Sequence, residues 1–301
     1  MKLLFVVNPI SGGVNKEPFL EEAQGLCNNY GIEFFVFKTT GTDDDKKLEA
    51  VLKTFKPDKV VSVGGDGTTL FTAIVLQHTN LPMGIIPLGS ANGMAIELEV
   101  QQKPIEALKD IIMSDVIGEL DMVVVNDLYY SIHIGDVGIN AAIVNAYDKD
   151  EKRGMATYVK YFIEALSTVE HFKMTIECNN EILHTEGIMV GICNSRKYGT
   201  GVPINLNGNP MDGLFEIVII EDFNVNSLIS AGLSSFNEKF SDSEYKTTIS
   251  TTKAKISFET PRLLQLDGEI IGEFKTLDIS VLKGSVKFIT TQNNSYLKAV
   301  K

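Results

Sequence analysis

Along the first 120 residues, short apolar runs alternate with longer segments whose apolar residues recur at helical spacing. The runs are continuously apolar, as expected for strands that are buried on both faces of a sheet. Residues 17–29 and 44–55 have helical spacing and are followed by Gly31 and Pro57, which end helices. Because strands that alternate with helices require parallel crossovers, this part is predicted to be a doubly wound α/β layer. The strands predicted here are residues 3–7, 32–37, 60–63 and 83–86.

Beyond residue 122 the pattern changes to many short strands punctuated by Gly and Asn, which predicts an antiparallel sandwich or barrel. Two helices, over about residues 155–169 and 225–236, interrupt it. The expected division is therefore an α/β domain over residues 1–122 and a β-rich domain over residues 123–284. The strands predicted here are residues 122–125, 131–134, 174–178, 188–192, 215–220, 254–258, 262–266, 277–281 and 286–289.

Charge and hydropathy indicate whether nucleic acid or a membrane is an expected partner. The net charge of −12 and the pI of about 4.9 give no basic footprint, so nucleic acid is not an expected partner. The same charge argues against strong non-specific attraction to anionic lipid surfaces. No apolar run reaches the roughly 20 residues that span a bilayer, and residues 3–7 are typical of a strand rather than a signal peptide. A soluble or peripheral protein is expected.

The three cysteines, Cys27, Cys178 and Cys193, are few, odd in number and scattered. They are interpreted as buried thiols in a reducing cytoplasm rather than as a disulfide or metal set. The expected location is thus the cytoplasm, with peripheral membrane contact as the alternative. The sequence leaves a homodimer open.

Three glycine-containing segments each lie between a predicted strand and a following helix. They are Asn8-Pro9-Ile10-Ser11-Gly12-Gly13, Val63-Gly64-Gly65-Asp66-Gly67-Thr68-Thr69 and Pro87-Leu88-Gly89-Ser90-Ala91-Asn92-Gly93-Met94-Ala95. At the carboxyl ends of parallel strands, glycines leave room for phosphates against bare backbone. The second segment is neither a Walker A loop nor the dinucleotide fingerprint. The plainer alternatives are strand–helix turns and, for Ser90 and Asn92, helix capping.

Two later segments carry carboxylates next to glycine. In Asn209-Pro210-Met211-Asp212-Gly213-Leu214, Asp212 and nearby carbonyls could coordinate a hard cation through oxygen. In Gln265-Leu266-Asp267-Gly268-Glu269, two carboxylates two residues apart on a strand face the same side, and they could share a metal and a proton if the turn at Gly268 keeps that geometry. An Asp-Gly turn is the alternative at both places.

Taken in this order and with these intervals, the five segments resemble the diacylglycerol kinase catalytic family, which includes bacterial lipid kinases, sphingosine kinases and ceramide kinases. The resemblance covers nearly the whole chain. It implies an N-terminal α/β ATP-binding domain, joined by residues 285–301, a C-terminal β-sandwich-like lipid domain, and an active site in the cleft between them. It also implies ATP and Mg²⁺ as cofactors, and a lipid-like substrate met during transient contact with a membrane surface.

The resemblance assigns roles by position. Glu269 would accept the proton of the lipid hydroxyl, with Asp267 as a relay, and Asp66 would lie close to the phosphates and the metal. Asn209, Asp212 and Leu214 resemble the family's Mg²⁺ site. The residues that would bind the nucleotide are Asn8, Pro9, Ser11, Gly12, Thr39, Thr40, Gly64, Gly65, Asp66, Gly67, Thr68, Ser90 and Asn92.

The chain departs from the bacterial pattern at two places. Leu70-Phe71 stands where an Asn-Glu pair is usual, and Asn92-Gly93-Met94-Ala95 stands where Asn-Asp-Phe-Ala is usual. Two alternatives to a lipid kinase therefore stay open. One is an NAD-kinase-like enzyme that acts on a small polar alcohol, and the other is a catalytically weak nucleotide-binding protein.

Overall fold

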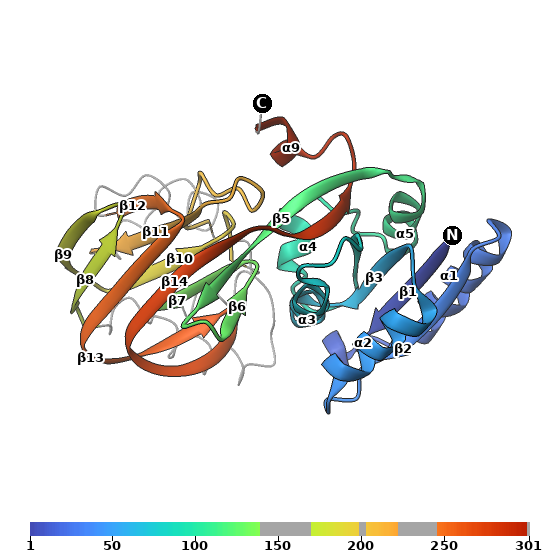
Figure 1. Ribbon diagram of the computed structural model, residues 1–301, viewed down its shortest axis with the longest axis horizontal. Coiled ribbons are helices and arrows are strands. Elements are labelled where there is room, and N and C mark those ends of the chain that lie inside the picture. The colour runs from blue at the N-terminus through green and yellow to red at the C-terminus, as the bar shows by residue number, and fades with distance from the viewer. Residues whose placement is uncertain (139–169, 199–202, 222–245, 300–301) are drawn as a thin grey trace, which may run out of the picture. The chain divides into compact units, whose positions relative to one another are not determined.

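The computed structural model describes residues 1–138, 170–198, 203–221 and 246–299. Its contacts divide the chain into two compact units, Met1–Leu120 with Lys283–Lys301, and Asp121–Leu282 (Figure 1). Strands β5 (Val116–Val125) and β14 (Glu269–Thr290) each run from one unit into the other. The helices expected over residues 155–169 and 225–236 lie outside the described residues.

The first unit is built on a parallel sheet in the order β4-β3-β1-β2, and the end of β14 pairs with β4. The chain passes from β1 outward to β2, then crosses back to β3 on the other side of β1. The direction of winding thus reverses between β1 and β3, which is the place where open α/β sheets bind ligands. The four strands are β1 (Lys2–Val7), β2 (Glu33–Lys38), β3 (Lys59–Gly64) and β4 (Met83–Pro87).

Helices cover both faces of this sheet, and β1, β3 and β4 are accordingly apolar and buried on both sides. Leu3, Phe5 and Val7 share a buried core with helices α1 and α5, whereas α3 packs against β1 and β3 and contacts α2. Helix α5 lies so close to β4 that a Cβ on Gly84 would stand 2.4 Å from Ile111. The helices of this unit are η1 (Ser11–Gly13), α1 (Glu17–Asn29), α2 (Asp44–Phe55), α3 (Asp66–Leu76), α4 (Gly93–Glu97), α5 (Pro104–Met113) and α9 (Ser295–Ala299).

In the second unit, antiparallel strands follow the order β12-β11-β10-β7-β13-β14. Strand β13 pairs with β8 through its first half and with β7 through its last residues, and its register shifts between Ser257 and Arg262, around Pro261. Such a shift lets one strand pass between two layers. The apolar core lies among these strands. The remaining strands are β6 (Tyr129–Ser131), β7 (Ile134–Val137), β8 (Phe172–Cys178), β9 (Glu181–Gly187), β10 (Met189–Cys193), β11 (Phe215–Ile220), β12 (Lys246–Thr251) and β13 (Lys253–Leu266).

The predicted fold class, an α/β domain followed by a β-sandwich-like domain, is confirmed. Three details differ from the expectation. The strand expected over residues 131–134 is two strands, β6 and β7, which are separated at Ile132 and His133. The four strands expected over residues 254–289 are two long ones, β13 and β14. Strands β9 and β12 were not predicted, because polar residues make up most of their length.

Candidate active site

Three loops meet at the carboxyl ends of β1, β3 and β4, and we call residues 8–13, 64–67 and 88–92 the glycine loops. A Cβ on Gly89 would lie 2.2 Å from the Cα of Gly65, and a Cβ on Gly12 would lie 2.8 Å from the carbonyl carbon of Gly89. The three backbones therefore touch at positions where only glycine fits. Bare backbone at the switch point of a parallel sheet is the kind of surface that receives phosphate groups.

Asp66 joins the second glycine loop to helix α4. Its carboxylate accepts hydrogen bonds from the backbone N–H groups of Gly93 (3.0 Å) and Met94 (2.8 Å), the first two residues of that helix. A negative charge at a helix N-terminus is favourable, and the carboxylate satisfies amides that have no partner inside the helix. The structure thus gives Asp66 a structural role, and its predicted place beside phosphates and metal stays a prediction.

Asn92 shapes the third glycine loop. Its backbone is left-handed, with φ of 54°, a conformation that Asn tolerates well. Its Oδ1 accepts a hydrogen bond from Gly89 N (2.7 Å), and its Nδ2 donates to Gly89 O (3.1 Å). The alternative that the Asn92 side chain caps the helix is not met, because Asp66 binds the first amides of α4 instead, and contact of Asn92 with nucleotide stays a prediction. Ser90 is exposed on this loop.

In the first glycine loop, polar side chains form hydrogen bonds with the backbone of the same loop. Asn8 Oδ1 accepts a hydrogen bond from Ile10 N (3.1 Å), and Ser11 Oγ donates to Asn8 O (3.2 Å). Lys16, which the sequence reasoning missed, is buried here and donates from Nζ to the carbonyls of Ser11 and Val14. Burial lowers the pKa of the Lys16 ammonium. A lysine at the start of the helix after a glycine turn was the signal available in the sequence.

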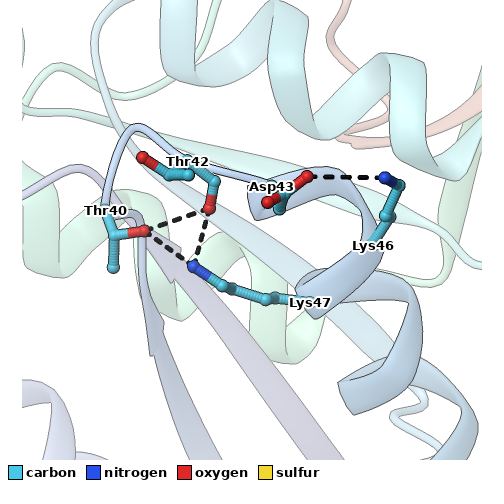
Figure 2. Close-up of polar contacts among 5 residues, drawn as sticks. All are labelled: Thr40, Thr42, Asp43, Lys46 and Lys47. Carbon is cyan, nitrogen blue, oxygen red and sulfur yellow. Dashed lines mark hydrogen bonds and ion pairs between the residues drawn. The ribbon is translucent and has the colours of Figure 1, made fainter.

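The loop after β2 holds the two threonines that were predicted to contact nucleotide. Thr39 N donates to Val7 O (2.9 Å), which places this residue beside the end of β1. The hydroxyl of Thr40 donates to Asp44 Oδ1 (2.8 Å) and accepts from Lys47 Nζ (3.1 Å), as Figure 2 shows for the lysine. Thr40 is thus bonded to the start of α2, and contact with nucleotide stays a prediction for both threonines.

In the second unit, the predicted metal residues form a compact turn before β11. Asn209 Oδ1 accepts from Met211 N (3.0 Å), and Asp212 Oδ1 accepts from Leu214 N (2.9 Å). Asp121, which the sequence reasoning missed, is fully buried and accepts from Gly213 N (2.6 Å). Its signal was an acid set between Leu120 and Met122 in the stretch that becomes β5. Oxygen donors of this kind suit a hard cation such as Mg²⁺, so the residues present fit the predicted metal.

Asp267 and Gly268 form the two-residue tip of the hairpin between β13 and β14, with φ of 50° and 91°. The turn at Gly268 does not keep the strand geometry that would set both carboxylates on one side, because Leu266 pairs with Glu269 across the tip, so the hairpin alternative holds. Positive φ at both turn residues is what a tight hairpin of this length requires. The two acids therefore flank a turn, and Glu269 begins the return strand.

The two acids have different surroundings. The Asp267 carboxylate accepts hydrogen bonds from Ser131 Oγ (2.5 Å), Ile132 N (3.0 Å) and His133 N (3.1 Å). Burial raises the pKa of Asp267, although these hydrogen bonds and His133 oppose the rise. The Glu269 side chain is exposed and has no hydrogen bond or ion pair to the part of the chain that the structure describes. Asp267 thus bonds the tip to residues 131–133, and proton acceptance by Glu269 with Asp267 as a relay stays a prediction.

Within the described ranges, no helix combines the length and the apolar character that a membrane crossing requires.

Comparison with known protein families agrees with this architecture. Residues 2–125 match the model of the diacylglycerol kinase catalytic domain, and residues 134–290 match that of the YegS C-terminal NAD kinase beta sandwich-like domain. A Klebsiella pneumoniae protein named "Probable lipid kinase YegS-like" is 29% identical over 216 residues, which are 70% of this chain and 72% of that protein. The Escherichia coli K12 protein named "Probable lipid kinase YegS" is 26% identical over 258 residues, 83% of this chain and 84% of that one.

A solved structure described as a diacylglycerol kinase from Bacillus anthracis has the same fold. It superposes with a TM-score of 0.73 at 19% sequence identity, and the match covers 97% of this chain and 98% of that one.

Proposed function

Because the chain belongs to the lipid kinase family that joins a diacylglycerol kinase catalytic domain to a YegS-type C-terminal domain, we propose that it transfers the γ-phosphate of ATP to a hydroxyl of a diacylglycerol- or sphingosine-like lipid. One observation carries the proposal: the direct contact of the glycine-loop backbones at the switch point of the parallel sheet. This bare surface is suited to the phosphates of a nucleotide.

In the proposed reaction, Glu269 takes the proton of the lipid hydroxyl. The oxygen then attacks the γ-phosphorus in line, the bond to the β-phosphate oxygen breaks, and ADP leaves. Backbone N–H groups of the glycine loops stabilise the charge that develops on the phosphate oxygens. Asp267 keeps Glu269 in position through its hydrogen bonds to residues 131–133.

The predicted cation belongs to the turn that precedes β11. Asn209, Asp212 and Leu214 would hold it, the last through its carbonyl oxygen, and when bound Mg²⁺ supplies positive charge that offsets the phosphates. We propose in addition that the protein is located in the cytoplasm and contacts a membrane surface transiently, because the proposed substrate is a lipid.

The test measures transfer of label from [γ-³²P]ATP to a mixed lipid panel in detergent micelles with Mg²⁺. We expect a labelled lipid with the wild type and a decrease of about 10²- to 10⁴-fold with Glu269→Gln, the range lost with a general base. Glu273→Gln is the matched control, because Glu273 is exposed on the same strand and the chemical change is identical. Equal losses in the two variants would contradict the role of Glu269.

A second candidate is an NAD-kinase-like enzyme, which the description of the matched C-terminal domain and the Leu70-Phe71 pair favour. The same assay with NAD in place of lipid distinguishes the two. Label in NADP and none in any lipid would overturn the lipid assignment. Tight ATP binding with no transfer to either acceptor would support the catalytically weak nucleotide-binding protein.

A further inference from the structure

A buried polar chain lies directly behind the hairpin tip. Asp136 on β7 and Gln265 on β13 stand opposite each other in the antiparallel register, and their exposed fractions are 1% and 2%. Asp136 Oδ2 accepts hydrogen bonds from Gln265 Nε2 (2.8 Å) and from the hydroxyl of Tyr198 (2.6 Å). A carboxylate between two donors accepts both, because ionised Asp is an acceptor only.

The other end of the Gln265 amide reaches the tip itself. Its Oε1 accepts a hydrogen bond from the backbone N–H of Gly268 (2.7 Å). A glutamine amide has one donor end and one acceptor end, so the group bound to the first end decides what the second presents. With Asp136 bound to Nε2, Oε1 faces Gly268. An amide turned the other way would set a donor against the Gly268 N–H.

The tip is therefore held on two sides. Asp267 is bonded to residues 131–133, and Gly268 is bonded through Gln265 to Asp136. Glu269 follows Gly268 directly, and its own side chain is exposed without a described partner. The backbone of the tip thus sets the place on β14 from which the Glu269 side chain extends. A side chain that holds Gly268 also holds that starting point.

We propose that Asp136 is a positioning residue for phosphate transfer, acting through Gln265 and Gly268 to hold Glu269 in place. The inference rests on the proposed function, because it assumes that Glu269 is the proton acceptor. Burial raises the pKa of Asp136 to about 6, so its carboxylate is ionised, and accepts both hydrogen bonds, at neutral pH and above. Burying a carboxylate is unfavourable unless its hydrogen bonds are satisfied. Asp136 is buried and connects through Gln265 to a single turn amide, which suits a positioning role.

The test compares Asp136→Leu with Asp136→Asn and Tyr198→Phe in the full chain at pH 7.5. Hydrogen exchange of the Gly268 amide is followed by NMR, alongside kcat and KM for ATP. Leucine removes the acceptor, so we expect the exchange rate to rise by about fivefold to tenfold and kcat to fall by a similar factor, with KM for ATP unchanged. Asparagine retains an acceptor oxygen, so Asp136→Asn should keep the Gly268 exchange rate and kcat within about twofold of the wild type. Tyr198→Phe leaves the Gln265 bond intact and should leave Gly268 protected.

Wild-type exchange at Gly268 in Asp136→Leu would overturn the proposal, and so would an equal effect of Tyr198→Phe. If Asp136→Leu does not fold, Gln265→Met breaks the same connection while Asp136 keeps Tyr198, and it should give the same rise at Gly268. The exchange measurement needs no turnover. A wild type that phosphorylates no lipid would therefore contradict the proposed function, while the Gly268 result still decides whether Asp136 fixes the tip.

Discussion

The glycines and polar side chains of the glycine loops meet backbone rather than other side chains. Asp66 binds two amides of α4, Asn92 binds both polar groups of Gly89, and Gly89 touches Gly65. Each contact fixes the path of one loop against another. The surface offered to phosphates is thus set by residues whose own side chains are absent or already bonded.

Replacing Gly89 with alanine should push two of these loops apart. The added Cβ would lie 2.2 Å from the Cα of Gly65, which is backbone and cannot rotate away. We expect Gly89→Ala to lower the free energy of unfolding by about 1–3 kcal/mol, as overpacking does, and to weaken ATP binding. Thermal unfolding and ATP titration measure the two effects.

Gly67→Ala is the control for stability, because a Cβ there meets no atom within 4 Å and its φ is not in the left-handed region. Its unfolding midpoint should match or slightly exceed that of the wild type. An equal loss of stability in both variants would show that crowding at Gly65 is not the cause.

Among the secondary-structure elements, the C-terminal end of α5 is hydrogen-bonded by a lysine of strand β3. Lys59 at the start of β3 is buried, and its Nζ donates to the carbonyls of Ile111 (2.9 Å), Ile112 (3.4 Å) and Ser114 (2.8 Å) at the end of α5. These carbonyls have no partner inside the helix, and a positive charge there is favourable. The bonds connect α5 to β3, next to the close packing of Ile111 on Gly84.

Lys59→Met keeps the apolar stem and removes the ammonium group. We expect the free energy of unfolding to fall by about 1–3 kcal/mol, because buried carbonyls lose their donor. Denaturant unfolding measures the change. Lys53→Met, on the exposed side of α2 and with one ion pair to Glu49 (3.6 Å), should change stability by less than about 0.5 kcal/mol. A loss at Lys59 no larger than that at Lys53 would contradict the capping role.

Across the whole molecule, several acids of the second unit are buried or partly buried. Asp136, Glu216 and Asp267 all have a raised pKa, and burial is the largest cause for each. In the first unit, burial also raises the pKa of Asp110, whereas hydrogen bonds from Thr40 and Gly41 lower the pKa of Asp44 although burial opposes them. The second unit should therefore show the pH dependence that raised acid pKa values produce.

For Asp136 the sign follows from a pKa of 3.8 when unfolded and about 6 when folded. Between these values the native state binds the proton more readily, so this group's stabilisation is full below about pH 4 and is lost as the pH rises through 6. Groups of the described residues that interact with Asp136 include Tyr198, Gln265 and, from β10, Cys193. The change amounts to about 3 kcal/mol at most.

The measurement is denaturant unfolding of the wild type and Asp136→Asn from pH 4 to pH 8. The stability of the wild type relative to the variant should decrease as the pH rises through this range. A difference between wild type and Asp136→Asn that stays constant from pH 4 to pH 8 would show that Asp136 does not titrate in this range.

The sequence by itself determined the four parallel strands of the first unit, its helices α1 and α2 and the order of its loops, whereas α5 and α9 were not predicted. Helices α1 and α2 have the predicted bounds, because their apolar spacing and the residues that end them are local signals. The five segments that carried the family resemblance also depend on sequence order alone. The full length of β13 and β14 could not be predicted from local signals. Their polar residues interrupt the apolar pattern, yet pairing with neighbouring strands keeps these residues within one strand.

Only the tertiary structure decided which groups meet. Asp66 lies 27 residues from Gly93, Asp136 lies 129 residues from Gln265, and Lys59 lies 52 residues from Ile111, yet each pair is hydrogen-bonded. The roles of Lys16 and Asp121 likewise follow from the backbone carbonyls and the backbone amide to which they are hydrogen-bonded. A buried polar group is stable only with a partner, and that partner is chosen by packing rather than by spacing along the chain.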